Sequence, residues 1–242
     1  MRATIVRAML LLCCAAAAAA RAEVQLLQPW STSGGTLAPP WHLAGLPNQK
    51  KPFTRFVLVE HDGRRAMRIE ADSSYGNLVH PLRIDGTALT LSWSWRVDEF
   101  VAESDLRIKN GDDTAVKVCV FFDLALEQIG IVERQIMRIA RAASHEPLPA
   151  ATVCYVWDRL LPAGTMLDNA FTHRVRYLVL QTGEAKARRW VDERRDVGAD
   201  FLRLFGQEST QVPAIVGVAI GADADNTHGH SIAHVADLVL AP

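Results

Sequence analysis

Residues 89–97, with the sequence LTLSWSWRV, alternate strictly between apolar and polar side chains. The apolar side chains share one parity and are Leu89, Leu91, Trp93, Trp95 and Val97. Because successive side chains of a β-strand point to opposite faces of its sheet, this pattern predicts a strand with one buried and one solvated face. The two tryptophans are therefore expected in the core rather than on a binding surface.

Strand patterns recur along most of the chain. Residues 54–61 and 65–71 flank Asp62-Gly63, which is a turn signal of β-hairpins. Further strands are expected at 114–123, 152–158, 174–182, 187–195, 214–221 and 231–240. Residues 126–143 have the spacing of a helix, and residues 200–205 are expected to form a second, short one.

This succession of strands with one or two short helices predicts a mainly β fold. The expected architecture is a single antiparallel β-sandwich of the jelly-roll type. The domain organisation that follows is a leader over residues 1–22, an irregular lead-in segment over 23–52, and the β-sandwich domain over 53–242.

The N-terminus has the features of a secretory signal peptide. Arg2 and Arg7 precede the uncharged run 8–20, and Ala20-Arg21-Ala22 matches the small-x-small cleavage pattern. The run has 13 residues, whereas a membrane-spanning helix needs roughly 20. We expect cleavage after Ala22, a periplasmic or secreted location, and no membrane span in the mature chain.

Removing the leader changes the charge and the cysteine count. The 242 residues carry 26 basic and 27 acidic side chains, and loss of the three leader arginines leaves 23 against 27, a net charge of −4. A mildly acidic chain is not expected to bind nucleic acid. Of four cysteines, only Cys119 and Cys154 remain. In an oxidising compartment they form one disulfide or stay as two buried thiols, and the sequence does not decide between these states.

A ligand-binding groove is the first candidate site. Arg96 lies on the polar face of strand 89–97, and Lys117 and Asp123 share the mixed second face of strand 114–123. In a jelly roll such faces can line a groove, where the two cations would bind an acidic group of a glycan or another ligand. The alternative is a solvated sheet face.

Two acidic loops form the second candidate. Asp112 and Asp113 precede one strand, and Asp223, Asp225 and Asn226 follow another. We expect Asp225 and Asn226 at the rim of the groove, and the four aspartates are candidate calcium ligands. The Asp-x-Asp-x-Thr spacing matches the start of a calcium loop, but the glycine and the closing glutamate of that loop do not follow. Capping of the loops by their own side chains is the alternative.

Histidines 228, 230 and 234 crowd the segment HGHSIAH. In an extended strand all three would face one side, as in some zinc sites. No supporting cysteine or HExxH helix is present, so a solvated loop is favoured.

Catalytic signatures are weak. The sequence contains no GxSxG, Walker or GxGxxG motif. A glycosidase would need a carboxylate pair, and Asp123 with Glu193 or Asp196 is the candidate pair. The arginines within residues 190–200 indicate surface ion pairing instead.

Five motifs in order resemble the bacterial exported family known as domain of unknown function 3047. They are LSWSWRVD (91–98), KNGDDTAVKVCVFFD (109–123), CYVWDRLLPAG (154–164), WVDERRDVGADFLRLFG (190–206) and VAIGADADNTHG (218–229). The resemblance implies an exported domain without an established activity, so it assigns no catalytic residue. It also implies that the acidic loops belong to the recurring pattern of the family, whereas HGHSIAH departs from it.

The leading functional expectation is an exported, non-catalytic domain that binds a glycan or another cell-envelope component. One alternative is a polysaccharide hydrolase or lyase with paired carboxylates. The other is a structural or assembly protein of the envelope, which an exposed apolar patch would favour.

Overall fold

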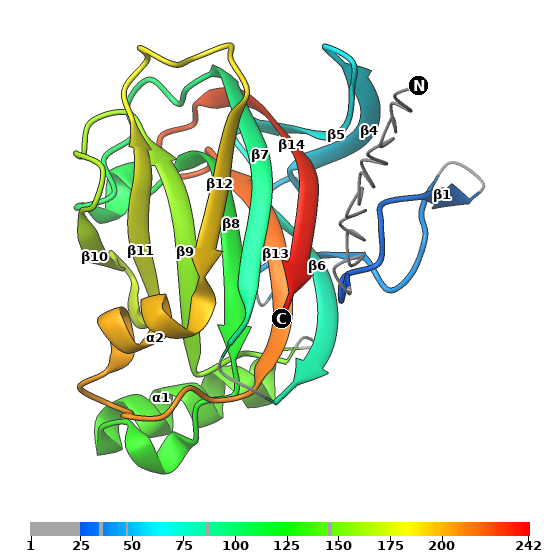
Figure 1. Cartoon of the computed structure of the whole chain (residues 1–242). Coiled ribbons are helices and arrows are strands. Elements are labelled where there is room, and N and C mark those ends of the chain that lie inside the picture. Colours follow the sequence, from blue (N-terminus) through cyan, green and yellow to red (C-terminus); the bar gives the residue numbers. More distant parts are fainter. Residues whose placement is uncertain (1–24, 34–35, 47, 86–87, 145–146) are drawn as a thin grey trace, which may run out of the picture.

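Two β-sheets packed face to face form the body of the molecule (Figure 1). The computed structural model describes residues 25–33, 36–46, 48–85, 88–144 and 147–242. The expected leader, residues 1–22, lies outside the described residues, so its cleavage stays a prediction. In the described part of the chain, no helix combines the length and the apolar character needed to cross a membrane.

The larger sheet has seven strands. In spatial order they are β10 (Met166–Asn169), β11 (Thr172–Thr182), β9 (Ala151–Asp158), β8 (Thr114–Phe122), β13 (Ile215–Asp223), β6 (Tyr75–Ile84) and β3 (His42–Ala44). The smaller sheet has five strands in the order β12 (Val191–Asp196), β7 (Thr90–Glu99), β14 (His230–Ala241), β5 (Arg64–Asp72) and β4 (Arg55–His61). Strands β1 (Thr32–Ser33) and β2 (Thr36–Leu37) pair with each other.

Two α-helices lie at the same end of the sandwich (Figure 1). They are α1 (Ile131–Ala143) and α2 (Val197–Phe205). Short 3-10 turns at Lys109–Gly111 and Leu126–Gln128 precede β8 and α1. The prediction of a mainly β sandwich with one or two short helices is confirmed.

The core between the sheets is aromatic, as the alternation in residues 89–97 predicts. Trp93 and Trp95 of β7 are 1% and 0% exposed. Across the sandwich, the ring of Tyr155 lies 5.2 Å from Trp93 and that of Trp157 lies 6.0 Å from Trp95, between centroids. These contacts join the centres of the two sheets and fix which face of each sheet is internal.

The structure differs from the sequence expectation at several places. Strand β10 is not among the expected strands, and the expected helix 126–143 begins as α1 only at Ile131. Strand β6 has no counterpart among the expected strands, because Gly76 and Pro81 interrupt its pattern. Strands β9 and β11 pair in parallel, whereas the other pairings in both sheets are antiparallel. The lead-in segment contributes β3 to the sheet edge, and it places Leu27 and Trp41 in the core.

Cys119 and Cys154 form a disulfide between neighbouring strands β8 and β9, where the two residues lie directly opposite each other. The bond closes a loop with a sequence separation of 35 residues. Replacing both cysteines by alanine is expected to lower the free energy of unfolding by about 3 kcal/mol, since the unfolded chain gains the freedom that the loop removes. Urea unfolding of the oxidised protein and of the double variant measures the difference. Equal midpoints would contradict a structural role for the bond.

Candidate functional site

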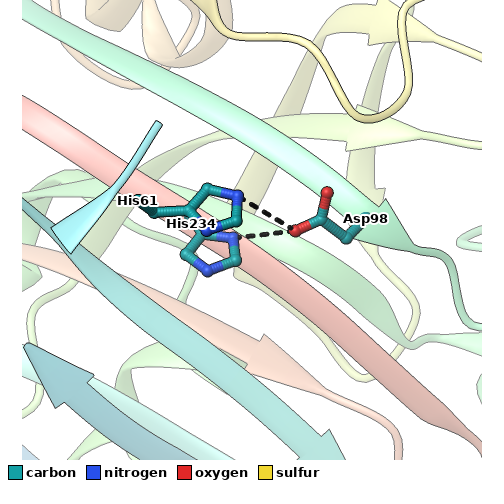
Figure 2. A group of neighbouring side chains, drawn as sticks. All are labelled: His61, Asp98 and His234. Atoms are coloured by element: carbon teal, nitrogen blue, oxygen red, sulfur yellow. Dashed lines mark ion pairs between the residues drawn. The ribbon is translucent and has the colours of Figure 1, made fainter. Parts of the chain in front are cut away.

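His61, Asp98 and His234 converge on the outer face of the five-stranded sheet (Figure 2). They come from β4, β7 and β14. His234 stands between Ala233 and Val235, and Asp98 follows Val97, all three of which pack into the core. Strand alternation therefore turns His234 and Asp98 to the outside.

The three side chains have the spacing of a metal ligand set. Their ligand atoms all lie within 4.8 Å of one another. Asp98 Oδ2 is 3.0 Å from His234 Nδ1 and 3.9 Å from His61 Nε2. Bonds of about 2.1 Å at tetrahedral angles place two ligand atoms about 3.4 Å apart, and the two distances bracket this value. Among the described residues this is the only such group of histidine, cysteine or carboxylate side chains.

His234 is a buried imidazole in its neutral form. Its side chain is 3% exposed, and Nδ1 has no hydrogen-bond partner of acceptable geometry, although Asp98 is near. Burial, together with the positive charges of His61, Arg68 and Arg96, lowers the pKa of His234 to about 4 against the opposing effect of Asp98. A neutral imidazole offers a lone pair to a metal ion. Eleven buried side-chain polar atoms of the described residues lack a partner, His61 Nε2 and His234 Nδ1 among them, and an ion is one explanation of such atoms.

The rings of His61 and His234 are stacked, with centroids 4.1 Å apart and planes 8° apart. Parallel rings direct their lone pairs side by side, so binding of one ion requires a ring to turn. The side chain of His61 is 30% exposed and ends β4 at the hairpin turn, which leaves it room to rotate.

A hydrogen bond from Arg96 holds Oδ1, the oxygen of Asp98 that is not directed at the imidazoles. Arg96 Nε donates to Asp98 Oδ1 at 2.6 Å, and the same guanidinium pairs with Asp62. This contact leaves Oδ2 directed at the imidazoles. Carboxylate ligands of metal sites are commonly oriented by such hydrogen bonds. Trp190 meets both imidazole rings edge-on at 6.3 Å, and it forms one wall of the cluster.

The structure does not bring the expected groove residues together. Arg96 lies on the outer face of the five-stranded sheet, whereas Lys117 lies on β8 of the seven-stranded sheet. Asp123 directly follows the C-terminal end of β8, and it pairs with Arg83 at 2.8 Å on the surface. A single groove lined by these three residues is therefore wrong, because strand parity points the two cations away from each other. Their individual contacts to a ligand stay predictions.

The two acidic loops do meet, beside Lys117. Asp113 accepts hydrogen bonds from the backbone N–H groups of Asn226 and Thr227 at 3.2 and 2.7 Å. Asp223 accepts from Lys117 Nζ at 2.7 Å and from the backbone of Thr114 at 2.9 Å. These carboxylates already accept hydrogen bonds from protein donors, which belong to the opposite segment and not, as the capping alternative expects, to the same loop. Calcium binding here stays a prediction.

Asp112 and Asp225 complete the acidic group. Asp112 accepts from Tyr177 at 3.2 Å and from Asn169. Burial, with a contribution from the nearby Asp113 charge, raises the pKa of Asp225, and Lys51 donates to its backbone oxygen at 3.0 Å.

The carboxyl of Asp112 makes stability depend on pH. Burial and repulsion from Asp223 raise its pKa from 3.8 to about 7. Between about pH 4 and 7 the folded chain holds a proton that the unfolded chain has released, so the contribution of Asp112 to stability falls as pH rises. The loss reaches up to about 4 kcal/mol above pH 7. Denaturant unfolding at pH 5 and 8 is expected to show a smaller loss in Asp112→Asn than in the wild type. An equal loss in both proteins would contradict this role.

Only one of the three crowded histidines belongs to the cluster. His230 lies near Glu99 at 3.0 Å and Glu70 at 3.4 Å, and His228 occupies a turn with φ of 54°. The expectation that the whole segment is a solvated loop is wrong for His234, which is buried in β14. His61 and Asp98 are not among the predicted site residues. The only sign of them in the sequence is their position: His61 ends the expected strand 54–61 before the Asp62-Gly63 turn, and Asp98 directly follows the strand 89–97.

The candidate catalytic carboxylates have separate structural partners. Glu193 accepts from Gln181 at 2.7 Å, and Asp196 caps α2 through the backbone of Ala199 at 2.9 Å. Asp123 pairs with Arg83. The structure provides no observation that joins them in one site.

Comparison with solved structures finds similar β-rich enzymes. The native family 12 xyloglucanase of Bacillus licheniformis is 8% identical over 74% of this chain and 83% of its own, with a TM-score of 0.43. The Cel12A catalytic domain of Humicola grisea is 11% identical over 89% and 96%, with a TM-score of 0.43. Endoglucanase 3 of Trichoderma harzianum, from family GH12, is 8% identical over 84% and 98%, with a TM-score of 0.41.

No curated protein sequence matches the chain. Residues 39–239 match the family described as "Protein of unknown function (DUF3047)", and the chain therefore belongs to that family.

Proposed function

We propose that this chain is an exported, non-catalytic binding domain that holds a divalent transition-metal ion at His61, Asp98 and His234. The observation that carries the proposal is the convergence of three ligand atoms within 4.8 Å around a buried, unpartnered imidazole nitrogen. Three protein ligands leave a further coordination position for water or for a group of a bound molecule.

The ligand types select the class of ion. Two imidazole nitrogens and one carboxylate suit zinc, nickel, cobalt or iron(II), whereas calcium and magnesium favour sites made entirely of oxygen ligands. The cluster is therefore expected to prefer zinc strongly over calcium.

A glycan ligand finds less support. Sugar rings commonly stack on exposed aromatic side chains, and all six tryptophans belong to the described residues. Four are buried, and Trp30 and Trp190 are only half-exposed. Arg64 also lies over the ring of Trp190 at 5.3 Å. The exposed aromatic side chains left for a sugar ring among the described residues are Phe53 and Phe171, which are 49% and 56% exposed.

Isothermal titration of the metal-free protein with zinc tests the proposal. We expect one ion per chain, and little heat from calcium. The His61→Phe/His234→Phe double variant should lose the zinc signal. His173→Phe is the matched control, because His173 pairs with Asp168 outside the cluster. A wild-type protein without a stoichiometric zinc signal, or a double variant that keeps it, would refute the proposal.

A further inference from the structure

Helix α1 turns its apolar face to the solvent. Ile131, Val132, Ile136 and Ile139 are 76%, 73%, 59% and 71% exposed. At 100° per residue these four side chains fall within one sector of the helix. A surface helix ordinarily buries its apolar stripe against the protein core, so this orientation is reversed.

The orientation is fixed by the opposite face. Met137 is buried there, and Arg134 donates from Nε to the backbone oxygen of Leu126 at 2.8 Å. Glu133 pairs with Arg174 at 3.0 Å, and Arg141 donates to the backbone oxygen of Leu148 at 2.9 Å. Because polar contacts along the helix hold it to the body, α1 cannot bury its isoleucines by rolling over.

The charge around the apolar face is positive. Arg138 is exposed at the edge of this face, and the single acidic residue of the helix, Glu133, is matched by Arg174. A second copy docked through the same face would bring the Arg138 side chains of both copies to one rim, which like-charge repulsion disfavours. An anionic surface complements both the aliphatic and the cationic side chains.

We propose that α1 docks this protein on an anionic lipid surface, with its four aliphatic side chains inserted among the headgroups and Arg138 paired with a lipid phosphate. Exposed aliphatic side chains beside arginines on a helix with a strongly polar opposite face are typical of helices that lie in the membrane interface. The docking surface uses none of the residues of the metal cluster, so it stands independently of the function proposed above.

Co-sedimentation of the purified protein with vesicles tests the proposal. Vesicles of phosphatidylethanolamine and phosphatidylglycerol are compared with vesicles of phosphatidylcholine alone. We expect binding to the anionic vesicles that weakens with added salt, and much weaker binding to the neutral ones.

Ile139→Asn is expected to lower the partition coefficient about tenfold, since an isoleucine no longer leaves water. Ile136→Asn/Ile139→Asn should lower it further. Ile108→Asn is the matched control, because Ile108 is 54% exposed outside α1. Circular dichroism confirms that each variant is folded.

Three outcomes would overturn the proposal. They are a wild-type protein that stays in the supernatant, an Ile139→Asn variant that binds like the wild type, and a loss of binding in Ile108→Asn equal to that in Ile139→Asn. A dimer that Ile139→Asn dissociates, without vesicle binding by the wild type, would assign the face to a second copy instead.

Discussion

Replacing Lys117 by methionine is expected to lower the free energy of unfolding by about 3–5 kcal/mol. The side chains of Lys117 and Asp223 are 6% and 5% exposed, and their charged atoms lie 2.7 Å apart. Burial alone would lower the pKa of Lys117, but the Asp223 carboxylate overrides this effect and raises it. The lysine is therefore charged, and its loss leaves a buried carboxylate without its counter-ion.

The aromatic surroundings add to the effect. Lys117 Nζ lies 5.0 Å from the centroid of the Tyr75 ring, so methionine also removes a cation–π contact. Asp112 stands near enough for its pKa to respond to both Asp223 and Lys117. Without the ammonium group, the Asp223 carboxylate loses its counter-charge, and above about pH 7 the Asp112 carboxylate adds to the repulsion.

Chemical denaturation measures this effect directly. Lys109→Met is the control, because Lys109 is exposed and makes a similar contact with the Phe171 ring at 5.4 Å. That variant should change stability by less than about 1 kcal/mol. Lys117→Met/Asp223→Leu should recover part of the loss, since it removes both buried charges. Equal effects of Lys117→Met and Lys109→Met would contradict a structural ion pair.

Replacing His234 by phenylalanine is expected to lower the affinity for zinc by more than about a hundredfold. The variant keeps an aromatic ring of similar shape, so it removes a ligand while it retains most of the packing. The loss should exceed that of a residue that only orients a ligand, for which about 10–100-fold is typical. Competition with a chromophoric chelator measures both affinities on one scale.

Arg96→Met tests the positioning of Asp98. Arg96 is not itself a metal ligand. Its Nε donates a hydrogen bond to Asp98 Oδ1 at 2.6 Å and so orients the carboxylate. We expect an affinity loss of about 10–100-fold. Arg68→Met is the control, since Arg68 pairs with Glu70 at 2.6 Å and not with Asp98. A comparable loss in Arg68→Met would show that the general positive charge of the sheet, rather than the orientation of Asp98, matters.

The sandwich could be predicted from local patterns because most of its longer strands carry their own signal. The alternation around Trp93 and Trp95 states which face is buried, and the pattern of residues 114–123 does the same for β8. If the strand were turned over, Trp93 and Trp95 would be exposed to solvent. The side chains that the alternation marks as apolar are therefore the ones that the fold buries. Strand β6 was not predicted, because Pro81 and Gly76 break its alternation. In the structure both residues nevertheless lie in the strand and pair with β13.

The site could not be predicted in the same way. Whether Arg96 and Lys117 share a surface depends on which sheet each strand joins, and alternation within one strand carries no information on that. The meeting of Asp113 with Asn226 and Thr227 results from strand order, which places β8 beside β13. His61 and Asp98 reach His234 because β4 and β7 end close to the first half of β14, and no spacing of residues in the sequence reports this.

The position of a bound ion would show directly whether His61, Asp98 and His234 hold a metal. Crystals of the protein grown with zinc are measured at the zinc absorption edge, and an anomalous difference map locates the metal. We predict one strong peak about 2.0–2.2 Å from His61 Nε2, His234 Nδ1 and Asp98 Oδ2, with the two imidazole rings no longer parallel. A map without a peak at these residues, or with its main peak at the acidic loops beside Asp112 and Asp223, would contradict the account.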